Sequence, residues 1–359
     1  MKAVILAGGE GTRLKPLTYR RPKPLIPIAG RPCIDYVIRS LVSAGFRELV
    51  IATAYLSDRL IQTIGDGEGY NASILYSFER TPAGTAGAVK RVANFIDATF
   101  VVAMGDVLAD VDFRALYDFH RDRGAVATIA LTEVQDPSQY GVAALDDRGR
   151  VTKFKEKPRA DEVFSHLANA GIYVLEPEAL DVVAVGEAVD FARDVFPKLL
   201  AKGLPVYGRE LEGVWVDIGR PRDLWRASME VVRREGRELA IPGVTTRGPL
   251  VVDPGTRIAA GVALRGPAFI AAGVEVGEAC VIENSCIYED ARLETGAHVV
   301  NSIVLEQSRV GPRSEVRDSV IAPNCTLEED VRIVGSIVGD EITIKAHSRL
   351  ENANVSPPQ

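Results

Sequence analysis

A regular spacing of aliphatic residues in the last third of the chain constrains the fold more than any other feature. Between residues 258 and 350, apolar side chains recur at steps of five or six, often with a small residue or Gly between them. Such a repeat is typical of a parallel β-helix, in which each unit forms one side of a coil and the aliphatic side chains stack inside. Seventeen positions follow the pattern: Ile258, Leu264, Ile270, Val276, Ile282, Ile287, Leu293, Val299, Val304, Val310, Val316, Ile321, Leu327, Ile333, Val338, Ile344 and Leu350.

We therefore predict a left-handed parallel β-helix with three-sided coils over residues 251–351. An ordinary sandwich of short strands would not keep one step over such a length. The five-residue steps, in ENSCI, VNSIV and RDSVI, depart from the repeat, and we expect the corners of the coil to absorb them. β-Helices often mediate assembly, so a homo-oligomer is expected.

Residues 1–235 instead alternate strand and helix signals. This order predicts a Rossmann-like, mainly parallel sheet with helices on both faces. The first half has expected strands at 3–6, 48–53, 73–78 and 99–104, with helices near 34–42, 60–64 and 85–95. The second half has an expected hairpin over 140–158, a strand at 169–177, a helix at 190–200, two strands within 204–217 and a helix at 221–234. The predicted organisation is one domain over 1–235, a linker over 236–250, the β-helix over 251–351 and a disordered tail over 352–359.

The segment that follows the first strand is rich in glycine. In LAGGEGTRL, Gly8, Gly9 and Gly11 permit a tight turn whose backbone N–H groups face one hollow, which suits a phosphate. Arg13 adds a planar fork of donors, and Lys23, in RPKPL, could supply a second positive charge. The presence of these two cations favours a phosphate-binding loop over a glycine-rich segment that only allows the chain to turn. The spacing matches neither G-x-G-x-x-G nor G-x-x-x-x-G-K-[ST], so neither a dinucleotide fold nor a P-loop is predicted.

Composition and charge exclude several classes of protein. The formal net charge is −7 without a long basic run, which argues against nucleic acid as a partner. The four cysteines form no CxxC motif, so neither a zinc site nor a disulfide framework is expected, and a reducing cytoplasmic setting is the simple interpretation. We also expect no signal peptide, no membrane span and no membrane partner.

Eight motifs occur in a fixed order: LAGGEGTRLKPLT, RPKPLIPI, PAGTAGAV, MGDVL, YGV, FKEKP, NAGIY and WVDIG. Together with the repeat, they make essentially the whole chain resemble the sugar-1-phosphate nucleotidyltransferases. The resemblance implies an enzyme that transfers a nucleotidyl group from a nucleoside triphosphate to a sugar 1-phosphate and releases pyrophosphate. It also implies Mg²⁺ as the cofactor, because two polyanions must be brought together and their charge held.

The resemblance also assigns candidate roles to individual residues. Local sequence alone would treat Lys153, Lys155 and Lys157 as one solvated face, so only the motif singles out Lys157. Likewise, Asp106 and Asp217 each follow or end a buried strand, where a carboxylate could simply cap a helix or a turn. The implied catalytic residues are Arg13, Lys23 and Lys157. The implied nucleotide-binding residues are Leu6, Ala7, Gly8, Gly9, Gly11, Thr12, Gly84, Thr85 and Asp106. The implied sugar-binding residues are Gly141, Glu156, Lys157, Asn169 and Gly171, and the implied metal ligands are Asp106 and Asp217.

The sequence says less about the base and the sugar. Thymidylyl- and uridylyltransferases commonly carry Gln after the active-site Lys, whereas this chain has Pro24. The PKPLIP form and the mixed five- and six-residue repeat are most similar to the mannose-1-phosphate guanylyltransferases, so GTP and mannose 1-phosphate are the favoured substrates. UDP- or dTDP-glucose synthesis stays open, and a pyrimidine enzyme would need another reader such as Glu79. Ala83 stands where Leu is usual in the family, so the resemblance does not determine which residues line the base pocket.

Two other classes of function stay open. The β-helix could be an acyltransferase, which would need a histidine in a cleft between coils. His298 and His347 are the histidines available in the repeat. Alternatively, the chain could be a catalytically silent regulatory subunit, although such relatives usually lose phosphate-binding residues that are present here.

Overall fold

The computed structural model describes residues 1–184 and 186–356, and the chain forms two compact units. The first unit contains residues 1–10, 22–25 and 33–217. The second contains residues 11–21, residues 26–32 and the chain from residue 218 onward. Two short pieces of the N-terminal region therefore group with the C-terminal repeat.

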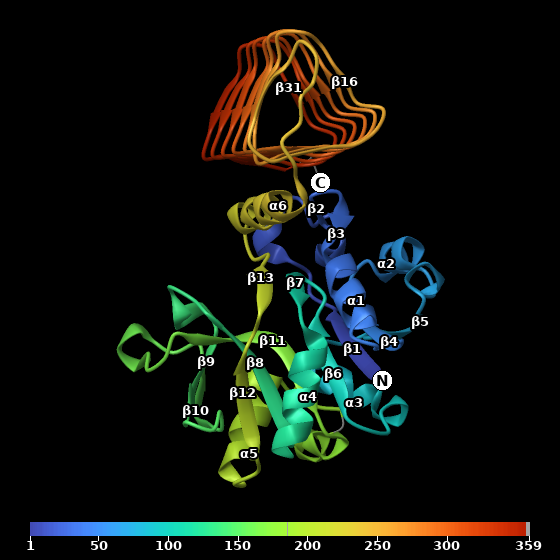
Figure 1. Ribbon diagram of the computed structural model, residues 1–359, viewed down its shortest axis with the longest axis vertical. Coiled ribbons are helices and arrows are strands. Elements are labelled where there is room, and N and C mark those ends of the chain that lie inside the picture. Colours follow the sequence, from blue (N-terminus) through green and yellow to red (C-terminus); the bar gives the residue numbers. More distant parts are fainter. Residues whose placement is uncertain (185, 357–359) are drawn as a thin grey trace. The chain divides into compact units, whose positions relative to one another are not determined.

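The first unit is built on a nine-stranded sheet (Figure 1). One half is parallel, as predicted, in the order β6-β1-β4-β5. These strands are β1 (Lys2–Ala7), β4 (Glu48–Thr53), β5 (Ser73–Phe78) and β6 (Phe100–Met104). The other half is mostly antiparallel, so the sheet is mixed. Its strands are β8 (Ala127–Glu133), β9 (Gly141–Leu145), β10 (Val151–Glu156), β11 (Leu167–Leu175) and β12 (Val206–Glu210).

Helices cover both faces of this sheet, as predicted, because the buried strands carry apolar residues on both sides. In β1, Ala3 and Ile5 enter one core with α1 (Cys33–Ser43), while Val4 and Leu6 enter another with α3 (Gly84–Arg91). This alternation is the period of two that a strand imposes. The unit also contains α2 (Ser57–Ile64), α4 (Phe113–Arg123) and a π-helical turn (Phe191–Val195) that leads into α5 (Phe196–Ala201).

Helix α4 has no counterpart among the helices expected from the sequence, and it buries only Phe113, Leu116 and His120. So narrow an apolar stripe gives a weak periodic signal. The ends of the helix are nevertheless well defined. The Asp112 side chain accepts a hydrogen bond from the Ala115 amide at 2.9 Å, and Gly124 ends the helix with φ +56°.

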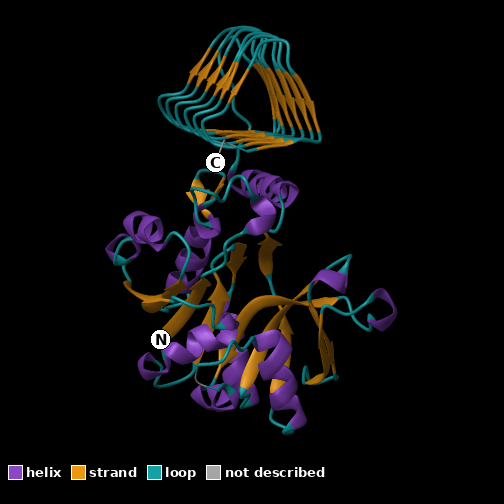
Figure 2. Ribbon diagram, turned by 180° about the vertical axis from the view of Figure 1, so that it is seen from behind, coloured by secondary structure: helices purple, strands orange, loops and turns teal. Residues whose placement is uncertain are grey.

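The second unit contains α6 (Pro221–Glu235) and a parallel β-helix of three sheets, which Figure 2 shows as three rows of strands. One row comprises β14 (Thr245–Arg247), β17 (Ala263–Arg265), β20 (Val281–Glu283), β23 (His298–Val300), β26 (Glu315–Arg317), β29 (Arg332–Val334) and β32 (Arg349–Glu351). The next comprises β15 (Leu250–Val252), β18 (Ala268–Ile270), β21 (Cys286–Ile287), β24 (Ile303–Val304), β27 (Val320–Ile321), β30 (Ile337–Val338) and β33 (Asn354–Val355). The third comprises β16 (Arg257–Ile258), β19 (Glu275–Val276), β22 (Arg292–Leu293), β25 (Arg309–Val310), β28 (Thr326–Leu327) and β31 (Thr343–Ile344).

The repeat predicted this β-helix correctly. Each of the seventeen aliphatic positions lies in its own strand, in order from β16 to β32. Side chains from successive coils stack in rows, because Val276 pairs in register with Leu293 and Leu293 with Val310. Only the first and last positions, Ile258 and Leu350, are half-buried rather than buried, since each lacks a neighbouring coil on one side.

The five-residue steps all fall at one corner of the coil. A residue with left-handed φ stands there in each step, namely Asn284, Asn301, Asp318 or Gly335. It precedes a buried serine: Ser285, Ser302, Ser319 or Ser336. The Ser302 hydroxyl accepts a hydrogen bond from the Ser319 amide at 3.1 Å and donates to the Val300 carbonyl at 2.7 Å. Serine hydroxyl groups therefore satisfy the hydrogen-bonding needs of the backbone at the shortened corner, from one coil to the next.

The ordered repeat is longer than the sequence analysis expected. Strand β14 lies inside the predicted linker of residues 236–250, and Arg237 exchanges backbone hydrogen bonds with Leu250. At the other end, β33 falls in the predicted tail of residues 352–359 and pairs with β30, while 357–359 lie outside the described residues.

Two of the short strands, β2 (Pro27–Ile28) and β3 (Arg31–Pro32), pair with each other. Across the described residues, no helix combines the length and apolarity needed to span a bilayer.

Replacing Ser302 with Ala should destabilise the β-helix without changing its fold. The substitution leaves the buried Ser319 amide without its acceptor, and an unsatisfied buried donor costs about 1–3 kcal/mol of unfolding free energy. Chemical denaturation of the variant and of the wild type measures this loss. The exposed Ser356→Ala variant is the control, and equal stability of all three proteins would contradict the proposed role of the corner serines.

Candidate active site

The carboxyl ends of β1 and β6 form the edge of the sheet at which the predicted phosphate loop begins. The Gly105 amide, just after β6, donates to the Leu6 carbonyl at 2.8 Å, while Ala7 ends β1. A side chain at Gly8 would approach Glu79 Oε2 to 3.4 Å, whereas one at Gly9 would meet nothing within 4 Å. The backbone at Gly9 is thus open, while Gly8 lies close to Glu79, and both glycines are at the strand ends, where α/β sheets bind ligands.

Lys23 is buried between the two predicted metal-binding aspartates. Its Nζ lies 2.7 Å from Asp106 Oδ2 and 3.6 Å from Asp217 Oδ1. Burial alone would lower the pKa of Lys23, but the two carboxylates outweigh it and raise that pKa above its ordinary value. Lys23 therefore stays charged and compensates both acids.

The two aspartates meet because of strand pairing. Strand β13 (Gly213–Asp217) runs antiparallel to β7 (Val107–Val111) and sets Asp217 opposite Val107, the residue after Asp106. The sequence suggested both positions from strand ends, but this pairing joins segments more than a hundred residues apart. Cys33, at the start of α1, is buried near this group, and its burial, together with Asp106, raises the pKa of its thiol.

The donor set fits a hard divalent cation. Two carboxylates that face one ammonium group offer adjacent oxygen ligands, and Mg²⁺ usually takes one or two protein carboxylates and completes its shell with phosphate oxygens and water. Among the described residues there is no cluster of three or more His, Cys, Asp or Glu side chains that could form an all-protein metal site. Asp106 and Asp217 would hold a metal that arrives with a triphosphate.

The predicted sugar-binding residues gather on β9, β10 and β11. A side chain at Gly141 would come within 2.7 Å of Glu156 Oε2 and 3.4 Å of Asn169 Cβ, so glycine is required there. Burial raises the pKa of the Glu156 carboxyl, an effect that nearby Lys157 opposes. These polar groups suit the hydroxyls of a sugar.

Asn169 and Gly171 connect this group to the end of β6. Asn169 Oδ1 accepts from the Gly171 amide at 2.9 Å, and its Nδ2 donates to the Tyr173 hydroxyl at 3.0 Å. Gly171 has φ +71°, and a side chain there would lie 2.7 Å from Met104 Cγ. Met104 is two residues before Asp106, so the predicted sugar-binding residue Gly171 packs against a residue that lies close to the predicted metal ligand Asp106 in the chain.

Lys157 does not continue the alternation of its strand. It follows β10 with φ +45°, and its amide donates to the Tyr140 carbonyl at 2.9 Å. Its side chain is 66% exposed, with Nζ 3.9 Å from Glu156 Oε1, while Lys155 pairs with Glu162 at 2.7 Å. The left-handed backbone therefore takes Lys157 out of the alternation of Lys153 and Lys155, and its mostly exposed side chain lies near Glu156, a predicted sugar-binding residue.

Gly84 and Thr85 have a clear structural role. A side chain at Gly84 would lie 2.4 Å from the Val189 carbonyl oxygen. The Thr85 hydroxyl donates to Asp190 Oδ2 at 2.8 Å and accepts from the Phe191 amide at 2.9 Å. Thr85 therefore clasps the start of α3 to the π-helical turn. Asp190 was not anticipated, because its partner is distant in sequence.

Glu79 is a further candidate at the same edge of the sheet. It follows β5 directly, and its Oε1 is buried without a hydrogen-bond partner in the described part of the chain. Burial raises the pKa of this carboxyl, and Arg91 opposes the shift. The sequence analysis considered Glu79 only for a pyrimidine, although a charged residue immediately after a buried parallel strand is itself a signal for a site.

Gly11, Thr12 and Arg13 belong to the second unit. Gly11 has φ +64°, and its carbonyl accepts from the Thr18 hydroxyl at 2.9 Å. Thr12 and Arg13 are exposed in a short 3-10 turn, Thr12–Leu14, while Leu14 is buried. Arg13 enters none of the ion pairs found among the described residues, so its guanidinium is available to an anion.

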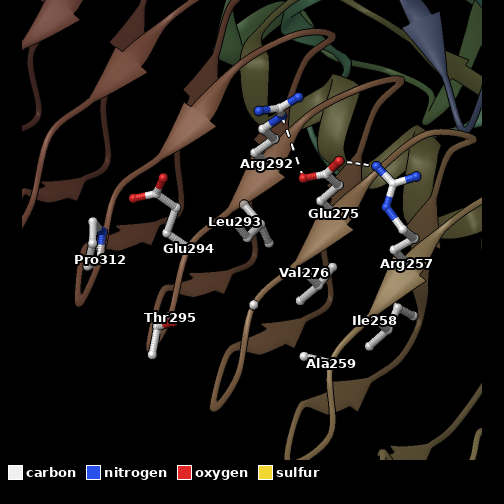
Figure 3. Close-up of a pocket in the computed structure, with 11 residues that line it drawn as sticks. Arg257, Ile258, Ala259, Glu275, Val276, Arg292, Leu293, Glu294, Thr295 and Pro312 are labelled. Atoms are coloured by element: carbon white, nitrogen blue, oxygen red, sulfur yellow. Dashed lines mark hydrogen bonds and ion pairs between the residues drawn. The ribbon is translucent and has the colours of Figure 1, made fainter.

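A pocket of about 640 Å³ lies on the β-helix (Figure 3). Glu275 pairs there with both Arg257 and Arg292, which neutralises much of its charge. Neither of the repeat's two histidines is among the described residues that line this pocket, and His347 is 71% exposed beside Asp330. The acyltransferase alternative therefore gains no support from this pocket.

Comparison with known proteins identifies the family of this chain. Residues 2–234 match the family described as nucleotidyl transferase, and residues 246–359 match the GMPPB C-terminal domain. A UTP–glucose-1-phosphate uridylyltransferase of Synechocystis is 36% identical over 85% of this chain and 87% of its own length. A mannose-1-phosphate guanylyltransferase of Mycobacterium tuberculosis is 36% identical over 82% of this chain and 81% of its own.

A solved structure is also similar to this chain. A Bacillus anthracis protein described as a glucose-1-phosphate thymidylyltransferase, in complex with a sucrose, superposes with a TM-score of 0.57 at 27% identity, covering 64% of this chain and 94% of that one. The sheet with its open glycine loop, lysine and paired aspartates is the framework of a nucleotide-binding enzyme. The chain belongs to the nucleotidyl transferase family, among the sugar-1-phosphate nucleotidyltransferases, whose members act on a nucleoside triphosphate and a sugar 1-phosphate with a divalent metal.

Replacing Lys23 with Met should tighten metal binding while lowering turnover. The variant loses the charge that compensates Asp106 and Asp217, so a divalent cation no longer competes with the ammonium group, and we expect Mn²⁺ to bind about tenfold more tightly. Electron paramagnetic resonance titration with Mn²⁺ measures the affinity without any turnover. Lys155→Met, which removes an exposed pair elsewhere, is the control. Unchanged or weaker Mn²⁺ binding in the Lys23 variant would contradict the assignment.

Proposed function

We propose that this enzyme transfers a guanylyl group from GTP to mannose 1-phosphate and forms GDP-mannose and pyrophosphate. The observation that supports the choice of base is the Glu79 carboxylate near Gly8. Among the described residues its Oε1 is buried without a hydrogen-bond partner, and its Oε2 would lie 3.4 Å from a side chain at Gly8. Guanine presents two adjacent N–H donors, at N1 and at the exocyclic amino group, and one carboxylate can accept both. Uracil and thymine instead present a single N–H between two carbonyl oxygens, and an ionised carboxylate would repel these oxygens.

The raised pKa of Glu79 makes the proposed preference for guanine dependent on pH. A protonated Glu79 could donate to a pyrimidine carbonyl, whereas the ionised form favours guanine. Activity with GTP should therefore fall as the pH drops through the raised pKa of Glu79. Pro24, the residue after Lys23, has no side-chain amide to contact the base, so another residue of the site would have to recognise it.

The reaction places few demands on proton transfer. An oxygen of the sugar phosphate attacks the α-phosphorus of the triphosphate, the bond from that phosphorus to the bridging oxygen breaks, and pyrophosphate leaves with the electron pair. Lys23, Arg13 and the backbone at Gly8 and Gly9 would hold the triphosphate. Lys157 would bind the phosphate of the sugar 1-phosphate, and Glu156 and Asn169 would orient sugar hydroxyls.

The metal we propose is Mg²⁺, held by Asp106 and Asp217. When bound, it would neutralise charge on the triphosphate and on the leaving pyrophosphate. Leu6, Ala7, Gly11 and Thr12 would line the triphosphate, with Gly84 and Thr85 beside the base. Gly141 and Gly171 would leave room for the sugar.

The organisation of the chain follows the same proposal. Residues 1–235 would form the catalytic domain, and the repeat from about 251 would serve assembly of a homo-oligomer in the cytoplasm. The uridylyltransferase relative keeps UDP-glucose synthesis as the second candidate.

A panel of nucleotides and sugars tests the reaction directly. The purified chain is incubated with each of GTP, ATP, UTP and dTTP against mannose 1-phosphate and glucose 1-phosphate, and pyrophosphate release is measured. We expect the highest kcat/KM with GTP and mannose 1-phosphate. Release only with UTP or dTTP would overturn the choice of base, and no release with any pair would favour the regulatory alternative.

Replacing Glu79 with Gln should shift the enzyme from purine to pyrimidine. The amide still accepts one N–H but now donates where guanine also donates, so we expect kcat/KM for GTP to fall by about 10- to 100-fold. The same amide can pair with a pyrimidine, so activity with UTP or dTTP should rise. Glu10→Gln, a change at an exposed acidic residue of the glycine-rich segment after β1, is the control. An unchanged GTP preference would exclude Glu79 as the reader.

A further inference from the structure

The predicted phosphate loop, residues 6–14, runs from the first unit into a segment that groups with the second unit. The chain leaves the first unit after Glu10, runs through residues 11–21 in the second unit and returns at Pro22. Residues 26–32 also belong to the second unit, and we call residues 11–21 the first excursion and residues 26–32 the second excursion. Arg13 lies within the first excursion, and Lys23 lies in the short stretch between the two.

Side chains of the β-helix hold the first excursion at three points along its length. Arg20 forms an ion pair with Glu341, and Arg21 forms one with Glu306. The Lys15 carbonyl accepts a hydrogen bond from Asn354 Nδ2 at 3.1 Å. Leu14, Leu17 and Thr18 are buried. The excursion is therefore packed and paired in the second unit, apart from the exposed turn that carries Arg13.

The second excursion is held as well. The Tyr288 hydroxyl donates to the Pro27 carbonyl at 3.0 Å, and Tyr288 is only 1% exposed. Gly30 has φ +88°, and a side chain there would lie 2.7 Å from the Phe269 ring. The segment that carries Lys23 is thus flanked on both sides by stretches fixed to the repeat.

The charge around Arg20 and Arg21 makes the attachment specific. Burial raises the pKa of Asp340 and of Glu289, and in both cases Arg21 opposes the rise. The carboxylates that interact with one or both arginines therefore include Glu289, Glu306, Asp340 and Glu341. The arginines are the counter-charges of an acidic face of the β-helix, and leaving that face would uncover its charge.

We propose that the β-helix anchors the phosphate loop, and that Glu306 and Glu341 are positioning residues for nucleoside triphosphate binding. A loop whose following residues are fixed to the β-helix loses less conformational entropy when it closes on a ligand, so anchoring favours binding of the triphosphate. This inference rests on the proposed function, because it assigns the loop to the triphosphate. It gives the β-helix a part in the reaction besides assembly.

The test combines kinetics with hydrogen exchange in the Glu306→Gln/Glu341→Gln double variant of the full chain. We expect KM for the nucleoside triphosphate to rise about three- to tenfold, while KM for the sugar 1-phosphate changes by less than about twofold. Amide exchange over residues 11–21 should become faster. The charge-swapped variant Arg21→Glu/Glu306→Arg should restore part of the lost affinity.

The control is Glu275→Gln, which breaks the ion pairs with Arg257 and Arg292 on another face of the β-helix. It should change neither KM nor exchange over residues 11–21. Wild-type exchange and KM in the double variant would overturn the inference. Because exchange requires no turnover, it decides the anchoring even if the enzyme proves to use none of the expected substrates, and that result would refute only the proposed function.

Discussion

The active edge of the sheet depends on one buried ammonium group. Lys23 lies between Asp106 and Asp217, and without it two carboxylates would face each other with little solvent to screen them. The pairing of β13 with β7 brings the second aspartate to this place, and the turn after β6 brings the first. A site that binds a metal with a polyphosphate needs both signs of charge within a few ångströms, and this arrangement supplies them.

The fold of the repeat was predictable because its signal is local and periodic. Each aliphatic position faces the interior for the same reason as its neighbours, so a step of five or six residues determines the whole β-helix. The parallel half of the sheet was predictable because its strands are continuous apolar runs. Helix α4 was not, since it buries few side chains and is defined mainly by its caps.

The candidate site was predictable in its parts but not in its connections. Glycines, lysine and aspartates after strands marked the edge of the sheet. The clasp between Thr85 and Asp190, and the left-handed backbone that turns Lys157 out of its strand, depend on tertiary contacts that no local pattern reports. Glu79 was undervalued because a lone acidic residue after a strand is common. What distinguishes it is that its buried Oε1 has no hydrogen-bond partner among the residues that the structure describes.

The central claim is that Asp106, Asp217 and Lys23 together receive a metal-bound triphosphate. The most direct test is a crystal structure of the protein with Mn²⁺ and a non-hydrolysable GTP analogue, in which anomalous scattering locates the metal. The account predicts a manganese ion coordinated by both carboxylates and by phosphate oxygens, with the Lys23 ammonium group moved onto the phosphates. A metal bound elsewhere, with Lys23 still between the two aspartates, would contradict it.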